Sequence, residues 1–455
     1  MKMTKRRPGE FAEFECELHE RVMEFERDVV AGEMAKLDID VPAVVIDGKV
    51  HRRVLRQSQR FMTAAGEVSV ERWLYKDRAD GGGHCVSPME LTMGVVGGFW
   101  TPRAAEQALW VVSQMTPGKV EELFKRVGNM APSKSSIGRL PKEVSERWEG
   151  SRADFEEALR AGLVVPENAV SIAVSIDGVL APFGQSEATQ AREEAATEGR
   201  LLKGAVGYRE VGCATISFCD ENGELLAAVR MSRAPEYKKE SLKKQLAAEV
   251  SEILKKQPTL RLMKLADAWA DNWTFLTKQL PPGDELIDFF HATEKVHVAM
   301  AAVYGDATLE TQFRAKRLND ALRDETDGAK RVIRALRHLA AKHPRKELVR
   351  RSLLYFRRNC DRMRYAEMKA KGLPIGSGVV EAACKTLVTQ RLKLSGMRWS
   401  NVGAQAILTP RGWVQSERFD KAWALIAATY QAEVTVLANV IAIKPKTEPR
   451  RRASR

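Results

Sequence analysis

AVSIAVSID, residues 169–177, is the stretch that decides how this chain folds. Its length and its β-branched side chains predict a buried strand that Asp177 closes. A second apolar run, Leu260–Ala266, ends in the same way at Asp267. A carboxylate at the end of a strand is held rigidly. Because both strands end in an aspartate, we expect the two carboxylates to meet at one edge of a sheet.

A third carboxylate, Glu381, lies in GSGVVEAACK, residues 376–385, which predicts a helix that opens after a flexible turn. Two carboxylates about 5 Å apart repel by roughly 3 kcal/mol at an effective dielectric constant near 20, so such a cluster implies a cation. Paired Mg²⁺ or Mn²⁺ ions activate a water molecule and stabilise the leaving oxygen of a phosphodiester. We predict that Asp177, Asp267 and Glu381 are catalytic and hold two such ions. Taken singly, each acid is equally explained as a helix cap or a solvated side chain.

Several blocks around these acids resemble the ISKra family of bacterial insertion-sequence transposases. The most specific is LPIGSGVVEAACKTLV, residues 373–388, followed by RLKLSGMRW, residues 391–399. SIDGV, residues 175–179, is similar to the family's first aspartate block, and LADAWADNWTFL, residues 265–276, is similar to its second. Further blocks follow in the same order at IDFFHATE, residues 287–294, AQAILTPRGW, residues 404–413, and SERFDKAW, residues 416–423.

The resemblance implies a transposase of the DDE type with a ribonuclease-H-like fold, which cuts and joins double-stranded DNA at the element ends and the target. It also implies a homodimer or a higher assembly on DNA. One departure is Ala268, where such families usually place glycine after the second aspartate. Asp288, expected inside the next strand, and His291 either orient a phosphate or metal-bound water, or form ordinary buried hydrogen bonds.

The net charge of +13 points to a polyanionic partner. Residues 311–371 carry 19 Lys plus Arg against 7 Asp plus Glu, an excess of 12, and residues 444–455 carry six against one. Arg357, Arg358, Arg362 and Arg364 alternate with aromatic residues and are predicted to contact DNA. Lys385, Arg391 and Arg398 are available for phosphate oxygens. For both sets, a solvated helix face is the alternative.

The chain is predicted to be an α/β protein with a ribonuclease-H-like mixed sheet, a helical insertion, and a mainly helical DNA-binding region before it. The expected parts are an amphipathic helix and linker (1–60), a helix-turn-helix-like DNA-end-binding region (61–165), the first part of the core (166–292), the basic helical insertion (293–371), the closing helices with Glu381 (372–435) and a basic tail (436–455). Residues 185–200 are expected to form a mobile loop. A recognition helix is expected to begin either at Ser136 or, because proline interrupts helices, at Pro141.

No apolar run has the length of a membrane span, and the N-terminus lacks the apolar stretch of a secretory signal, so a cytoplasmic, nucleoid-associated protein is expected. The chain has no phosphate-binding Walker loop, so no nucleotide is expected. Two alternatives to transposition remain open. One is a structure-selective nuclease with the same fold, and the other is an inactive, domesticated protein that only binds DNA.

Overall fold

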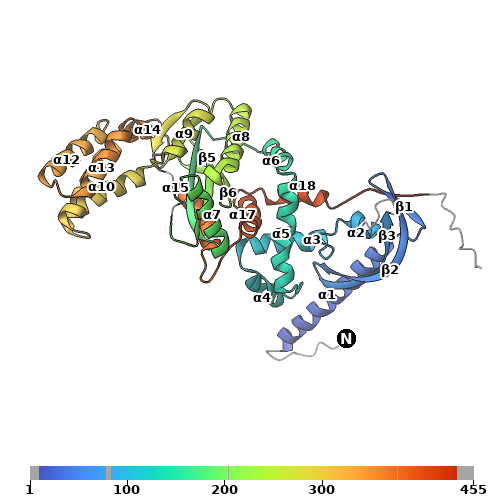
Figure 1. Cartoon of the computed structure of the whole chain (residues 1–455). Helices are drawn as coiled ribbons and strands as arrows, with labels where there is room; N and C mark the ends of the chain where they lie inside the picture. The colour runs from blue at the N-terminus through green and yellow to red at the C-terminus, as the bar shows by residue number, and fades with distance from the viewer. Residues whose placement is uncertain (1–9, 78–83, 203, 377, 438–455) are drawn as a thin grey trace, which may run out of the picture. The chain divides into compact units, whose positions relative to one another are not determined.

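The computed structural model describes residues 10–77, 84–202, 204–376 and 378–437. The chain divides into two compact units: residues 1–147 with 423–455, and residues 148–422 (Figure 1). Each unit contains helices and one sheet. Within the described residues, every helix is too short or too polar to cross a bilayer. Most of the basic tail predicted for residues 436–455 lies outside the described residues.

The first unit contains a four-stranded antiparallel sheet with the order β3-β2-β1-β9. Its strands are β1 (Ala43–Ile46), β2 (Lys49–Thr63), β3 (Gly66–Asp77) and β9 (Val434–Val436). The expectation of a linker before residue 60 is therefore wrong, and β3 lies in the region 61–165 for which the sequence predicted helices. The side chains of β2 are almost all exposed as far as residue 60, so this strand lacks the alternation of polar and apolar residues that marks a half-buried strand.

Helix α1 (Glu10–Lys36) packs on this sheet through one face only. Met34 is buried, and Val30 and Ala31 pack beside it against β3 residues Val68 and Val70. A second apolar stripe on the same helix is exposed and consists of Phe11, Leu18, Val22, Phe25 and Val29. This exposed stripe is therefore not the face that packs on the chain's own sheet.

Helices α2 (Pro88–Met93), α3 (Pro102–Gln114) and α4 (Pro117–Val127) follow, and α5 (Lys134–Gly150) continues into the second unit. Helix α5 begins where Ser133 Oγ accepts a hydrogen bond from the amide of Ser136 at 3.2 Å. Pro141 lies inside α5 and does not interrupt it, so the expectation that it would end or start a helix is wrong.

The second unit contains a five-stranded mixed sheet with the order β6-β5-β4-β7-β8. Its strands are β4 (Ser171–Pro182), β5 (Tyr208–Cys219), β6 (Leu225–Arg233), β7 (Arg261–Ala266) and β8 (Asp284–Ile287). Strands β4, β5 and β6 pair antiparallel, whereas β7 is parallel to both β4 and β8. Along the chain, β4 is followed by the hairpin β5–β6, helix α8 (Glu240–Lys256), β7, helix α9 (Ala270–Gln279) and β8.

Two predictions for this sheet need correction. Asp177 does not end β4, because the strand continues to Pro182 and Asp177 lies opposite Cys213 of β5. It is the parallel pairing with β7 that stops two residues earlier, at Ser175 and Leu265. The segment expected to be a mobile loop forms helix α7 (Gln185–Thr197), which agrees with its content of Ala, Glu and Gln.

Helices cover both faces of this sheet. One core cluster joins β4 and β7 to α8 through residues such as Ile172, Val174 and Leu246. The other cluster places Val211 and Cys213 of β5 against the closing segments, which are α15 (Gly378–Ala383), the π-helical segment Cys384–Thr389, α16 (Gln390–Leu392) and α17 (Asn401–Gln415). Helix α18 (Phe419–Ala428) then leads into the first unit.

Between β8 and the closing helices, the chain is helical. The segments are α10 (Phe289–Tyr304), α11 (Leu309–Asp324), α12 (Gly328–Lys342), α13 (Glu347–Asn359) and α14 (Tyr365–Ala370). They pack on one another through buried residues such as Val332, Leu336 and Phe356, which belong to the same core cluster as β4.

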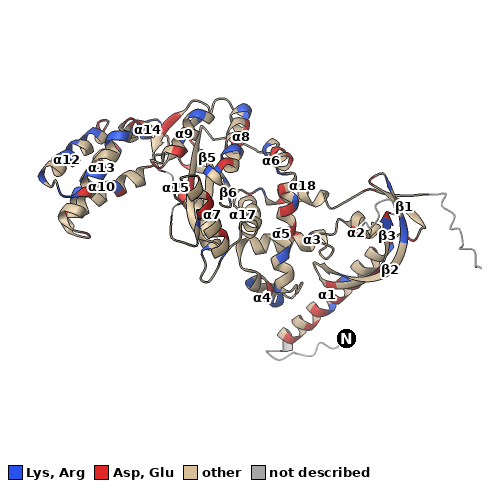
Figure 2. Cartoon of the chain, in the orientation of Figure 1, with Lys and Arg blue, Asp and Glu red and all other residues tan. Residues whose placement is uncertain are grey.

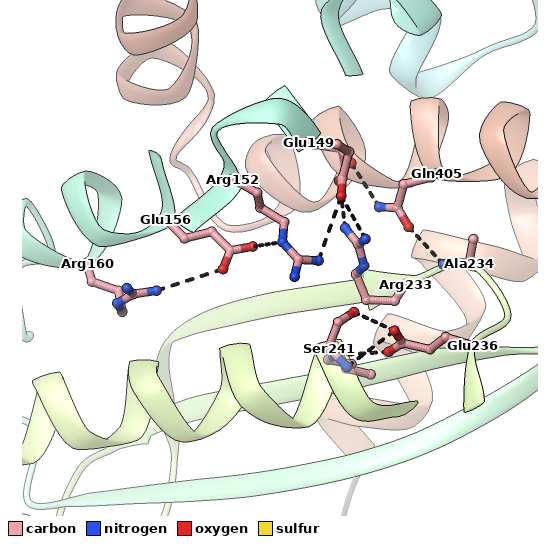
Figure 3. Close-up of polar contacts among 11 residues, drawn as sticks. Glu149, Arg152, Glu156, Arg160, Arg233, Ala234, Glu236, Ser241 and Gln405 are labelled. Carbon is pink, nitrogen blue, oxygen red and sulfur yellow. Dashed lines mark hydrogen bonds and ion pairs between the residues drawn. The ribbon is translucent and has the colours of Figure 1, made fainter. Parts of the chain in front are cut away.

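Ion pairs attach the start of this unit to the sheet (Figure 3). Glu149 at the end of α5 receives two hydrogen bonds from Arg233 of β6, at 2.6 and 2.8 Å. Helix α6 (Arg152–Ala161) carries Glu156, which lies 3.7 Å from Arg152 and 3.9 Å from Arg160. Each of these contacts is made inside the second unit.

Candidate functional site

Asp177 lies in β4, the central strand of the mixed sheet, and Asp267 follows the neighbouring strand β7. Asp177 is half-buried, and its Oδ1 accepts a hydrogen bond from the amide of Gly178 at 2.7 Å. Asp267 directly follows β7, as predicted. Because β4 and β7 run parallel up to Ser175 and Leu265, both carboxylates lie just beyond the same end of this strand pair.

Contacts from α9 and the turn before it hold Asp267 in place. Its Oδ1 accepts hydrogen bonds from the amide of Trp269 at 3.1 Å and from Nδ2 of Asn272 at 3.2 Å. The indole of Trp273 donates to the backbone carbonyl of Asp267 at 2.6 Å. Asn272 also donates to the carbonyl of Ile176 at 3.4 Å, so it links the two strand ends.

Asp288 does not lie inside β8, contrary to the prediction, but is the cap residue at the start of α10. Its Oδ1 accepts a hydrogen bond from the amide of His291 at 2.9 Å. Its own amide donates to the carbonyl of Ala266 at 2.9 Å, which places it beside the end of β7. Asp288 is fully buried, whereas His291 is half-buried.

Glu381 lies on α15 and is exposed. The loop before α15 is fastened to α10, because the amide of Phe289 donates to the carbonyl of Ile375 at 3.1 Å. Gly376 lies against the ring of Phe290, and a Cβ at this glycine would come within 2.9 Å of that ring. The helix that carries Glu381 therefore begins from a loop held against the first turn of α10.

Three of these side chains form a compact donor group. One ligand atom each from Asp288, His291 and Glu381 lies within 4.8 Å of the other two. Among the described residues this is the one group of His, Cys, Asp and Glu with such spacing, and the predicted set of Asp177, Asp267 and Glu381 does not meet it. The sequence predicted for Asp288 and His291 only a role in orienting a phosphate or metal-bound water, and not direct ligation.

The pKa shifts of Asp177 and Glu381 show that the acids of this site lie close enough to repel one another. Burial raises the pKa of Asp177, and the charge of Asp267 raises it further, while the hydrogen bond from Gly178 opposes the shift. Burial also raises the pKa of Glu381, with added repulsion from Asp288 and Asp177 and an opposing effect of His291. The carboxylates thus repel one another, and a cation between them would relieve that repulsion.

Tyr355 of α13 also faces this neighbourhood. Its hydroxyl is buried and has no hydrogen-bond partner in the described structure. Burial raises the pKa of Tyr355, and the charges of Asp267 and Asp288 raise it further. A helix of the basic insertion therefore contributes a polar group next to the acids of the sheet.

The predicted DNA-contacting arginines of the insertion differ in their surroundings. Lys and Arg recur along α12 and α13 (Figure 2), and Arg357 and Arg358 at the end of α13 are exposed. Arg362, in contrast, donates to Glu285 at 2.7 Å and lies over the ring of Trp273 at 4.4 Å. Arg364 bonds Glu367 at 3.3 Å. Arg362 thus has a structural role that the sequence did not indicate.

The three cations predicted after Glu381 also differ. Lys385 and Arg398 are exposed. Arg391 is 1% exposed, so a direct contact with a phosphate does not fit this arrangement. Burial lowers the pKa of Arg391 to about 10, and the nearby Arg411 adds to this shift. Arg411 itself donates to the carbonyl of Leu387 at 3.1 Å and to that of Thr386, within the π-helical segment.

Comparisons with known proteins identify no close relative. No family model matches the chain, and no curated protein matches it. A solved structure, the Drosophila P element transposase strand transfer complex, aligns with 72% of this chain and 83% of that one. The sequence identity is 9% and the TM-score is 0.26, so the similarity is weak.

Proposed function

We propose that this protein is a DDE transposase, which binds the ends of an insertion sequence and catalyses metal-dependent cleavage and strand transfer of DNA. The observation that carries the proposal is the gathering of Asp177, Asp267, Asp288 and Glu381 at one end of the paired strands β4 and β7. Mg²⁺ or Mn²⁺ bound there would supply the charge that phosphodiester chemistry requires.

The connectivity supports a ribonuclease-H-like assignment. An antiparallel hairpin beside β4, followed by two strands parallel to it with helices between them, is the arrangement expected for such a core. The helical residues 289–370 enter between Asp267 and Glu381, where the resemblance implies an insertion. Their excess of Lys and Arg suits contact with DNA that lies over the acids.

Glu381 belongs to two groups of side chains: the acids Asp177, Asp267 and Glu381, and the compact group with Asp288 and His291. Asp177, Asp267 and Glu381 offer only oxygen donors, which Mg²⁺ prefers. These three carboxylates would hold the ions, which would supply the Lewis acidity that activates a water or a 3′-hydroxyl and stabilises the leaving oxygen of a phosphodiester. Lys385 and Arg398 are exposed after the helix of Glu381 and are placed to contact phosphate oxygens.

The test is a reaction on plasmid DNA that carries the sequences flanking this gene, with Mg²⁺ or Mn²⁺. Asp177→Ala, Asp267→Ala and Glu381→Ala should each abolish cleavage while DNA binding persists. Cleavage retained in one variant removes that residue from the catalytic set. Cleavage without joining of a 3′-hydroxyl end would favour the nuclease alternative, and binding without cleavage by the wild type would favour the inactive DNA-binding protein.

We also infer that two copies pair through α1. The exposed stripe repeats with separations of seven, four, three and four residues, which is the spacing of a coiled-coil seam. Arg21 and Glu26 flank this seam at positions where, in a parallel pair, each faces the opposite charge on the partner helix. A dimer would present two active sites to the two ends of one element.

A further inference from the structure

We infer that Asp288, His291 and Glu381 form a divalent-cation site with a nitrogen ligand, and that this site favours Mn²⁺ over Mg²⁺. The inference rests on the proposed function for the role of the cation, and on the geometry of the three side chains for its position. It assigns direct ligation to two residues that lie outside the all-oxygen set of Asp177, Asp267 and Glu381.

The spacing of the three donors suits a single ion. Ligand bonds of about 2.2 Å allow two donors of one ion to lie up to roughly 4.4 Å apart. The donor atoms of Asp288, His291 and Glu381 all lie within 4.8 Å of one another, so only small side-chain adjustments are required. The all-oxygen set needs larger movements, because it does not form such a group.

Helix capping by itself explains only part of this arrangement. The hydrogen bond from the amide of His291 accounts for the position of Asp288. It does not account for the convergence of the His291 imidazole and the Glu381 carboxylate, which comes from a different segment, on the same point. A shared ligand explains all three positions.

The surrounding contacts hold two segments of the site together before any ion binds. The amide of Asp288 is bonded to Ala266, and the amide of Phe289 to Ile375. Gly376 allows the chain before Glu381 to lie against Phe290. Rigid positioning of ligands reduces the entropy lost on metal binding, so these contacts favour a preformed site.

The donor types determine the expected selectivity. Mg²⁺ prefers oxygen ligands and near-ideal octahedral geometry, whereas Mn²⁺ and Zn²⁺ accept imidazole nitrogen more readily. Two carboxylates and one imidazole therefore favour Mn²⁺, the more strongly bound of the two ions that support phosphodiester chemistry. The second ion, near Asp177 and Asp267, would then be the one that Mg²⁺ can supply.

The experiment measures Mn²⁺ binding to the full-length protein without DNA and without a histidine tag, by titration calorimetry and by pulsed electron paramagnetic resonance. The wild type should show the nitrogen coupling of an imidazole bound to Mn²⁺. His291→Gln should abolish that coupling and raise the Kd for Mn²⁺ at least about tenfold. Asp288→Asn should raise the Kd similarly, and a thermal melt checks that each variant is folded.

His297→Ala is the matched control, because this histidine lies on the same helix, is exposed, and has its imidazole 3.8 Å from Asp306. It should leave both the coupling and the Kd unchanged, and Asp267→Asn should keep the nitrogen coupling. A wild-type Mn²⁺ complex without nitrogen coupling, or a His291→Gln variant with unchanged affinity, would overturn the inference. A protein that binds Mn²⁺ through His291 but cleaves no DNA would contradict only the proposed function.

Discussion

The amide of Asp288 donates a hydrogen bond to the carbonyl oxygen of Ala266, at 2.9 Å. This bond places the cap of α10 beside Asp267, the residue that follows Ala266, and so joins the two donor sets of the site. The loop that leads to Glu381 is attached to the next residue, Phe289, through Ile375. Two short backbone contacts therefore determine how three segments meet around the acids.

Gly376 offers a direct test of this junction, because it lies against the ring of Phe290. Gly376→Ala would place a Cβ within 2.9 Å of the Phe290 ring, so the loop or the exposed ring must shift, and a shift of the loop displaces Glu381. We expect weaker Mn²⁺ binding and slower DNA cleavage with little change in the melting temperature. Gly378→Ala is the control, because a Cβ at Gly378 would meet nothing within 4 Å. Equal effects of the two substitutions on metal binding would show that contact with Phe290 does not position Glu381.

The sequence indicated the buried strands that carry Asp177 and precede Asp267, because both strands are continuous apolar runs bounded by polar residues. It misplaced Asp177 because the apolar pattern stops there, although β5 pairs with β4 as far as Pro182. It missed β2 because a strand with nearly all side chains exposed has no such pattern. Pairing with a neighbouring strand determines both the end of β4 and the formation of β2, and the periodicity of a sequence does not show such pairing.

Prediction of the site was limited in a similar way. Strand ends identified Asp267, and the motif identified Glu381, but nothing in the sequence shows which side chain reaches which. Asp288 was read as a strand residue because β8 is only four residues long and the boundary with α10 has no glycine or proline. Recognition of Asp288 as a helix cap would have placed His291 on the same side of the first turn.

Glu249 and Arg418 make a buried ion pair inside the second unit. Two hydrogen bonds of 2.8 and 3.1 Å join them, and their side chains are 2% and 10% exposed. Removing one partner leaves the other charge buried and unpaired, so Arg418→Met should lower the free energy of unfolding by about 3–5 kcal/mol. Urea denaturation measures the change.

The control for that experiment is the exposed pair of Arg314 and Glu310 on α11, where Arg314→Met should have little effect. Replacing both Glu249 and Arg418 with apolar residues of similar volume should recover much of the lost stability. A double variant as unstable as the single one would indicate that packing, and not the unpaired charge, causes the loss.

Arg357 and Arg358 test the DNA surface of the insertion. Both are exposed at the end of α13, and their replacement by Gln should reduce the slope of log affinity against log salt by about one for each lost phosphate contact. Arg362→Gln should instead lower the melting temperature, since Arg362 bonds Glu285 and lies on Trp273. Salt titrations of DNA binding by fluorescence anisotropy separate the two effects. An unchanged slope for Arg357 and Arg358 would identify a solvated helix face.

Glu156 should make stability depend on pH. Burial raises the pKa of this carboxyl above the ordinary value of about 4.5, with Arg152, Arg233 and Arg160 opposing the shift. The folded state then holds the proton more tightly than the unfolded state, so this stabilising contribution is present below about pH 4.5 and is lost as the pH rises through the folded pKa. Glu156→Gln should remove that dependence.

Urea denaturation of the wild type and of Glu156→Gln at several pH values checks this prediction. The stability of the variant relative to the wild type should increase as the pH rises above about 4.5 and then become constant. A relative stability that is the same at each pH would mean that Arg152 and Arg160, at 3.7 and 3.9 Å, fully compensate the burial of the charge.

The exposed stripe of α1 should cause self-association. Phe25 is 69% exposed and is the most exposed residue of the stripe, and Val30 and Met34 on the other face already pack against the sheet. Phe25→Asp should therefore convert a dimer to a monomer without unfolding the first unit, because the substituted side chain contacts no part of that core. Sedimentation velocity measures the mass, and Val127→Asp, at an exposed position on α4, is the control that should remain dimeric. A wild-type protein that sediments as a monomer at all concentrations, alone and on DNA, would contradict pairing through this helix.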